Sequence, residues 1–201
     1  MEHYSVLLNE AIENLNIKEN GIYVDATLGL GGHSSKILEK LTTGHLYSFD
    51  EDKMAISYAN ERLAKIGDNY TLIKSNFVNL KSELAKLGVT KIDGIVFDLG
   101  VSSPQIDTAS RGFSFSKDGL LDMRMDTDSP LTAEKVVNEY SKEELTSIFF
   151  NYGEEKQSRL IANKIIAKRP IKMTLELVEV INNIEKQEKL NESINMQMNV
   201  F

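Results

Sequence analysis

The stretch Ile22-Tyr-Val-Asp-Ala-Thr-Leu-Gly-Leu-Gly-Gly-His33 decides the fold, because a short apolar run passes directly into a glycine-rich turn. Residues 22–27 favour a buried β-strand. The three glycines that follow permit a tight turn and a close approach of the backbone to a ligand. Ser34 or Ser35 is then expected to cap a helix. The stretch therefore predicts a strand, a turn and a helix, which is how a βαβ unit begins.

Strand and helix patterns alternate around this stretch. Further buried strands are predicted at residues 45–50, 70–74 and 92–98, and helical spacing occurs at residues 6–15, 54–66 and 78–87. Such alternation is typical of an α/β fold with a parallel sheet and helices on both faces. After Asp98 the alternation stops, and the pattern becomes loop and then helix, with helical segments at 132–138, 141–151, 154–168 and 174–184. The sequence thus predicts a sheet of about four strands in residues 1–103, a small helical domain in residues 104–190 and a tail at 191–201.

Composition excludes several classes of protein. The chain has 201 residues, a net charge of −7 and 41% apolar residues, which is ordinary globular composition. It has no cysteine, which excludes disulfides and thiolate metal sites, and the three histidines show no metal-ligand spacing, so we expect no metal. We also expect no membrane span and no secretory signal, because the chain lacks a run of 18 apolar residues and a basic, apolar leader. The expected compartment is the cytoplasm.

The glycine turn is a candidate cofactor loop. Parallel sheets bind ligands at the carboxyl ends of their strands, and a helix N-terminus points its free N–H groups at such a ligand. Asp50 ends the second predicted strand, 19 residues after Gly31. A carboxylate at that position can accept hydrogen bonds from both ribose hydroxyls of an adenosine group. The alternative is a solvated acid in an ordinary turn, and the pattern leaves open whether the cofactor is NAD or S-adenosylmethionine.

Two further side chains are candidates for chemistry. Asp98 ends the fourth predicted strand, where its carboxylate can hold the cofactor's amino group or accept a hydrogen bond from a substrate N–H. A turn that leads into Gly100 is the alternative. His33 is a candidate base by residue type, although a contact with the cofactor or a helix cap fits its position better.

With these residues assembled, the chain resembles the bacterial 16S ribosomal RNA cytosine-N4 methyltransferases of the MraW (RsmH) family. The resemblance runs from about His3 through Leu177 and rests on separate motifs in a fixed order. These are His3–Glu10, Asp25–His33, Asp93–Gln105, Arg111–Phe115, Leu121–Asp126, Tyr152–Glu155 and Thr174–Leu177.

The resemblance implies a Rossmann-like, S-adenosylmethionine-dependent methyltransferase with a helical domain inserted after the fourth strand. It implies that Gly31, Gly32 and His33 line the amino-acid end of S-adenosylmethionine. Asp50 would hold the ribose, and Phe77 would pack near the adenine, with ordinary core packing as its alternative. Asp98 and Gln105 would complete the pocket.

The implied substrate is one cytidine of 16S rRNA in the small ribosomal subunit. The amino nitrogen of cytosine is a weak nucleophile, so the enzyme must orient it and accept a hydrogen bond from it as positive charge develops. Asp98, or a carbonyl in residues 99–104, is the candidate acceptor. Phe113 or Phe115 is a candidate for stacking on the base, with a core position as the alternative. Residues 156–172 hold six basic and no acidic side chains, which makes Lys164, Lys168 and Arg169 candidate RNA contacts or a solvated helix face.

The sequence departs from the family at its C-terminal end. A basic segment with a His-Pro-Ala-Lys-Arg-type motif and the family's remaining strands do not follow, and Ser110 and Met173 replace the usual Glu and Thr. We therefore expect a chain truncated relative to the family, with an exposed sheet edge that a homodimer would cover. The competing hypotheses are an inactive remnant that binds cofactor or RNA without turnover, and an NAD-linked oxidoreductase.

Overall fold

A computed structural model describes residues 6–183, which form two compact units. The first unit runs to Ser103 and also contains Met125–Asp128, whereas Pro104–Arg124 and the residues from Ser129 onward form the second. The chain therefore passes between the units three times. The predicted division at residue 103 did not include this return of the chain to the first unit. The predicted tail at 191–201 lies outside the described residues.

The first unit contains a four-stranded parallel sheet in the order β3-β2-β1-β4. Its strands are β1 (Ile22–Asp25), β2 (His45–Asp50), β3 (Tyr70–Lys74) and β4 (Gly94–Val96). In the sheet's register Val24 pairs with Tyr47 of β2 on one side and with Ile95 of β4 on the other. The predicted α/β fold with a parallel sheet of about four strands is confirmed.

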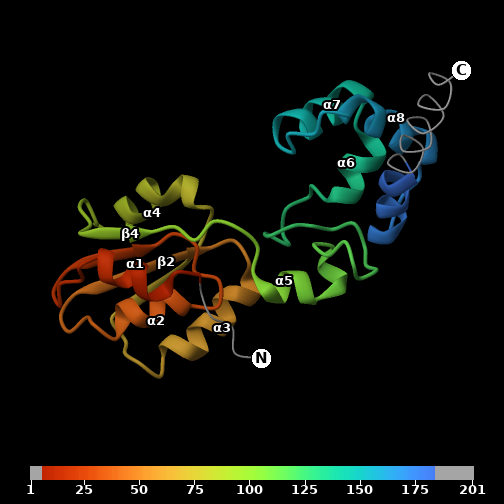
Figure 1. Cartoon of the computed structure of the whole chain (residues 1–201). Coiled ribbons are helices and arrows are strands. Elements are labelled where there is room, and N and C mark those ends of the chain that lie inside the picture. Colours follow the sequence, from red (N-terminus) through yellow and green to blue (C-terminus); the bar gives the residue numbers. More distant parts are fainter. Residues whose placement is uncertain (1–5, 184–201) are drawn as a thin grey trace, which may run out of the picture. The chain divides into compact units, whose positions relative to one another are not determined.

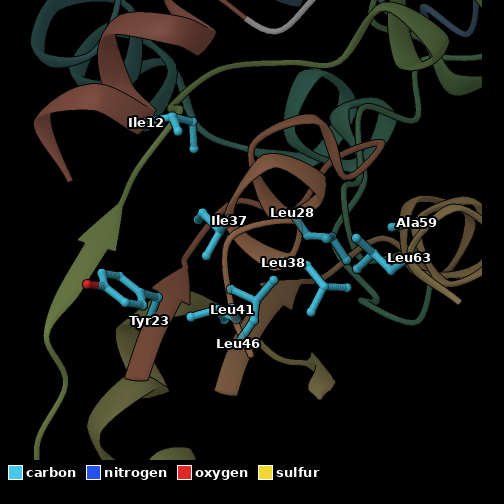
Figure 2. Packing of buried hydrophobic residues seen from close by; sticks show 9 residues of the cluster. All are labelled: Ile12, Tyr23, Leu28, Ile37, Leu38, Leu41, Leu46, Ala59 and Leu63. Atoms are coloured by element: carbon cyan, nitrogen blue, oxygen red, sulfur yellow. The ribbon is translucent and has the colours of Figure 1, made fainter. Parts of the chain in front are cut away.

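Helices cover both faces of this sheet. They are α1 (Leu8–Asn14), α2 (Gly32–Leu38), α3 (Lys53–Leu63), the 3-10 turn η1 (Phe77–Asn79) and α4 (Leu80–Lys86). Figure 1 shows α4 on one side of the sheet and α2 with α3 on the other. Side chains of α1, α2 and α3 pack with Tyr23, Leu28 and Leu46 in one apolar cluster, which Figure 2 shows.

The two faces follow from the alternation of side chains along a strand. Tyr23 belongs to the cluster under α1–α3, whereas its neighbour Val24 packs with Phe49 and Leu84 on the α4 side. Like β2, β1 has a strand on each side and a helical layer on each face, and three of its four residues are buried. The residues that follow β1 are consequently held in place by the rest of the unit.

The second unit is helical and has its own core. Its elements are α5 (Ser103–Asp107), which begins at the boundary, the 3-10 turn η2 (Ala109–Arg111), α6 (Ala133–Glu139), α7 (Lys142–Asn151), α8 (Ser158–Lys168) and a helix over the described residues 174–183. Leu145, Ile161, Ile165 and Ile171 form the centre of its core. Ser141 and Glu144 form a capping box that fixes the start of α7.

Two differences from the sequence predictions are local. The helix after the glycine turn begins at Gly32, because Gly31 takes a left-handed conformation and ends the turn there. Ser34 and Ser35 therefore lie inside α2 and do not cap it. No described helix is long and apolar enough to span a membrane.

Candidate functional site

The carboxyl ends of β1 and β4 mark the point at which the strand order changes direction. From β1 the chain continues through α2 to β2 on one side, whereas β4 pairs with the other side of β1. Open parallel sheets bind ligands at such a point. The main-chain N–H of Asp98 donates to Thr27 Oγ1 at 2.7 Å, which joins the loop after β1 to the residue after β4. The two loops are thus fixed beside each other at the expected position of a ligand.

The glycine turn fills the space between these ends and Asp50. Gly29 and Gly31 both have positive φ, at 51° and 76°, and Gly31 packs so closely on α3 that an added Cβ would lie 3.2 Å from Ala59 Cβ. Gly32 opens α2 directly after the turn. The glycines therefore serve two needs, which are a left-handed backbone and close packing of the turn on α3.

Asp50 is held in a fixed orientation at the end of β2. Its two carboxylate oxygens accept the N–H groups of Gly29 and Asp52, each at 2.8 Å. Each oxygen keeps a second lone pair, so the carboxylate can also accept hydrogen bonds from a diol. Burial raises the pKa of Asp50 above its ordinary value, and the main-chain N–H groups oppose this shift. The structure places Asp50 beside the glycine turn, as the sequence pattern suggested.

Asp25, at the end of β1, was not singled out by the sequence analysis. It is 1% exposed, and Ser34 Oγ donates to its Oδ2 at 2.7 Å while Thr27 N donates to its Oδ1. Ser34 also contacts the hydroxyl of Ser48 at 2.8 Å. Burial raises the pKa of Asp25, and the Ser34 hydrogen bond counteracts this effect. The buried carboxylate of Asp25 therefore holds the first turn of α2 through its hydrogen bond from Ser34.

His33 and Asp98 lie together at the rim of the turn. His33 is 4% exposed, and its Nδ1 is 3.8 Å from Asp98 Oδ2, whereas the Asp98 side chain is 41% exposed. His33 Nε2 is buried and has no hydrogen-bond partner in the described part of the chain. The arrangement gives one open carboxylate and one buried imidazole nitrogen that still needs a partner. In the contacts that the structure describes, the Asp98 carboxylate caps neither a helix nor a turn.

Two aromatic rings meet above the carboxyl ends of the strands. Phe77 follows β3 and Phe97 follows β4, which are the two outer strands, yet their ring centroids are 5.7 Å apart at 90°. Phe77 is 39% exposed and Phe97 is 48% exposed. Phe77 is therefore not a core residue, and Phe97 is an aromatic neighbour that the sequence analysis missed. Its position directly before Asp98 was the available signal.

The segment Met125–Asp128 is bound to the first unit by ion pairs. Lys74 Nζ is 2.9 Å from Asp126 Oδ1 and 2.7 Å from Asp128 Oδ2, and Lys53 Nζ is 2.7 Å from Asp128. Hydrogen bonds from Lys53 and Lys74 lower the pKa of Asp128 to about 2. These pairs are exposed and add little stability, but they fix the segment beside the end of β3. Sequence reasoning missed them because the partners lie far apart in the chain.

The remaining predicted site residues belong to the second unit, where they differ in burial and in the residues that they contact. Gln105 is buried in α5, Phe113 lies 5.9 Å from the Arg111 guanidinium, and Phe115 is 81% exposed. Lys164 and Lys168 lie on α8. The second unit thus offers one strongly exposed ring among the two candidate phenylalanines.

The Arg169 guanidinium forms hydrogen bonds within the second unit. Its Nε donates to the carbonyl of Val137 at 2.7 Å, and its Nη2 donates to the carbonyl of Tyr140. These carbonyls lie at the C-terminal end of α6, where helical carbonyls lack partners in the helix. Arg169 therefore stabilises the fold of the second unit, and its role as an RNA contact stays a prediction.

Comparison with known proteins gives the family. The model of the MraW methylase family matches residues 1–201. Ribosomal RNA small subunit methyltransferase H of Mycoplasmopsis agalactiae is 56% identical over 90% of this chain and 61% of its own length. The protein of the same name from Exiguobacterium sibiricum is 58% identical over 90% of this chain and 59% of its own length. An rRNA methylase structure from Streptococcus thermophilus covers 64% of this chain and 76% of that chain, at 23% identity and a TM-score of 0.40.

The chain thus spans about three fifths of the length of these relatives. The match of the family model along the whole sequence, together with identities above one half, establishes its ancestry. The chain belongs to the MraW methylase family.

Proposed function

We propose that the first unit binds S-adenosylmethionine at the carboxyl ends of β2, β1 and β4. The observation that carries this proposal is the adjacency of Asp50, the Gly29–Gly32 turn and Asp98 at the sheet's switch point. The donor and acceptor chemistry fits the cofactor. Asp50 has lone pairs for the ribose hydroxyls, and the half-exposed rings of Phe77 and Phe97 provide an apolar surface for the adenine.

The polar end of the cofactor fits the other side of the turn. His33 Nε2 is a buried nitrogen without a partner in the described residues, and it lies in the first turn of α2. A carboxylate near the start of a helix is favoured by the free N–H groups there. Gly31, Gly32 and His33 are therefore assigned to the amino-acid end of the cofactor, and Asp98 to the space between cofactor and substrate.

We infer that the chain's activity is transfer of a methyl group to the N4 nitrogen of a cytidine in 16S rRNA of the small ribosomal subunit. The names of the relatives support rRNA as the substrate class. Bound S-adenosylmethionine supplies an electrophilic methyl group on a sulfonium. Asp98 accepts a hydrogen bond from the cytosine amino group, and this bond strengthens as positive charge develops on the nitrogen. The target base must leave its stack to reach this carboxylate.

The geometry of Asp98 suits this role. Its main chain is fixed by Thr27, while its side chain remains 41% exposed, so the carboxylate is held at the rim but open to a ligand. His33 Nδ1 lies 3.8 Å from one of the carboxylate oxygens of Asp98, Oδ2. A positioned acceptor of this kind contributes about 10²- to 10³-fold to a rate. We propose the cytoplasm as the compartment of the chain and the small ribosomal subunit as its partner, because the names of the relatives support rRNA as the substrate class.

The experiment is a methyl-transfer assay with tritiated S-adenosylmethionine and small ribosomal subunits that lack the modification. We expect incorporation with the natural chain and a loss of about 100-fold or more in Asp98→Asn, which keeps the shape but removes the negative charge. Asp93→Asn serves as a control with the same change of charge. Asp93 lies at the opposite end of β4, where its carboxylate accepts the N–H of Ile22. Cofactor binding without any incorporation would instead identify a remnant that binds without turnover.

A further inference from the structure

A groove between α7 and the start of α8 is lined by charged, polar and aromatic side chains that are not part of the proposed cofactor site. It has a volume of about 480 Å³. Side chains from two helices line it, among them Lys142, Glu143, Ser147, Phe150, Asn151 and Arg159. The volume falls within the range of about 300–1,000 Å³ that small-ligand sites occupy. Both helices belong to the second unit and pack on each other (Figure 1).

Its two cations are available to a ligand. No ion pair is formed by Lys142 or Arg159 with any residue of the described part of the chain. The Arg169 guanidinium of the same unit, by contrast, donates to main-chain carbonyls. Glu143 is the acidic member of the lining, so the groove has a net positive charge in a chain of net charge −7. An anionic ligand is therefore favoured at this place.

The groove also presents an aromatic ring and hydrogen-bonding groups. Phe150 is 60% exposed, although large apolar side chains on a helix usually turn toward the core. Asn151 Nδ2 donates to Ser147 Oγ at 2.9 Å, which orients the amide and leaves its carbonyl oxygen for a donor. Each of these groups suits one part of a nucleotide in single-stranded RNA. The cations suit a phosphate, the exposed ring suits the face of a base, and the oriented amide suits the hydrogen-bonding edge of that base.

We propose that this α7–α8 groove, lined by Lys142, Phe150, Asn151 and Arg159, binds a nucleotide of single-stranded RNA. A base stacks on Phe150, and Arg159 and Lys142 contact the neighbouring phosphates. The proposal rests on the proposed function, because it adds an RNA docking site that does not take part in methyl transfer. It differs from the candidates Lys164 and Lys168, which do not line the groove.

The test is fluorescence anisotropy with the full chain and a labelled single-stranded RNA of about 12 nucleotides, within the range of about 4–16 that such sites cover. Affinity is measured across a range of salt concentrations. Phe150→Leu keeps an apolar side chain but removes the ring, and we expect it to weaken binding about tenfold with an unchanged salt dependence. Arg159→Gln is expected to weaken binding and to lower the slope of log affinity against log salt by about 0.7, the value for one phosphate contact.

Lys135→Gln is the matched control, because Lys135 is an exposed cation of α6 that does not line the groove. We expect it to bind RNA as the natural chain does, and Glu143→Gln to bind more tightly. The proposal is overturned if the natural chain does not bind the RNA, or if Phe150→Leu and Arg159→Gln match Lys135→Gln. It is also overturned if polyglutamate binds as tightly as RNA with the same dependence on Phe150.

This test separates the groove from the proposed function. Calorimetric titration with S-adenosylmethionine should give the same affinity for Phe150→Leu as for the natural chain, since the ring lies outside the first unit. Loss of cofactor binding in the natural chain would contradict the proposed function while the anisotropy result stands. Loss of RNA binding with cofactor binding intact would contradict the groove alone.

Discussion

Two neighbouring serines of α2 allow the role of the buried Asp25 to be measured. Ser34 and Ser35 are 0% and 2% exposed, lie on the same helix and both donate a hydrogen bond. Ser34 donates to the Asp25 carboxylate at 2.7 Å, whereas Ser35 donates to the neutral carbonyl of Gly31 at 2.6 Å. Substituting each by alanine changes the same atoms in the same helical setting. The two variants therefore differ chiefly in the charge of the acceptor that they leave behind.

The expected costs follow from this difference. A hydrogen bond to a charged group contributes about 1.5–3 kcal/mol to stability, and a neutral one about 0.5–1.5 kcal/mol. Ser34→Ala also leaves the Ser48 hydroxyl without its 2.8 Å contact. We expect Ser34→Ala to lower the free energy of unfolding by about 2–3 kcal/mol and Ser35→Ala by about 1 kcal/mol. The gain in helix propensity from serine to alanine is shared and cancels.

Urea-induced unfolding, followed by far-ultraviolet circular dichroism, measures both costs. Ser34 stabilises the ionised form of Asp25, whose pKa burial raises. The cost of Ser34→Ala should therefore be greatest at neutral pH and shrink as acid protonates Asp25. Equal costs for the two variants at neutral pH, or a gap that widens in acid, would refute the assignment of a charged acceptor.

Three further predictions concern the turn, the buried acid and the second unit. Gly31→Ala and Gly88→Ala both place alanine at positive φ, which costs about 1–2 kcal/mol. Of these two glycines only Gly31 packs against another side chain, so the Gly31→Ala variant should lose more stability in thermal unfolding. It should also be the one of the two that loses cofactor affinity. Burial raises the pKa of Asp25, so the stability that this group contributes is present in acid and lost as pH rises through the raised pKa. Asp25→Asn should lack this loss in urea titrations at several pH values, and a parallel decline in both proteins would exclude Asp25 as its source. Arg169→Gln should destabilise the second unit by about 1–2 kcal/mol in urea unfolding, while RNA affinity in anisotropy stays unchanged. Reduced RNA affinity in a fully folded variant would instead identify Arg169 as an RNA contact.

Much of the first unit could be predicted because its signals are local. Residues 45–50 and 70–74 are strands with the predicted bounds, since each is a short apolar run between polar turns. The fourth strand is shorter than predicted, at Gly94–Val96, because Phe97 and Asp98 already belong to the loop at the rim. The carboxyl ends of parallel strands all lie at the same edge of a sheet. A residue that ends such a strand must therefore lie at that edge, and Asp50 and Asp98 both do.

The parts that could not be predicted depend on contacts between distant residues. From its place in the sequence Ser34 could cap a helix, but in the structure its hydroxyl donates a buried hydrogen bond to Asp25. Lys74 meets Asp128 across 54 positions, and no local pattern indicates such a pair. Arg169 belongs to a basic run, and only the fold of α6 shows that its donors are used by carbonyls. Pattern and composition identify the type of a residue, whereas its partner depends on tertiary packing.

Binding of S-adenosylmethionine by the first unit is the central claim, and calorimetric titration tests it most directly. The natural chain should give saturable binding, Glu51→Ala should retain it, and Asp50→Ala should lose it, because Asp50 alone of these two acids accepts the N–H of the glycine turn. Circular dichroism would establish that each variant is folded. Absence of binding by the folded natural chain, or equal binding by both variants, would contradict the account.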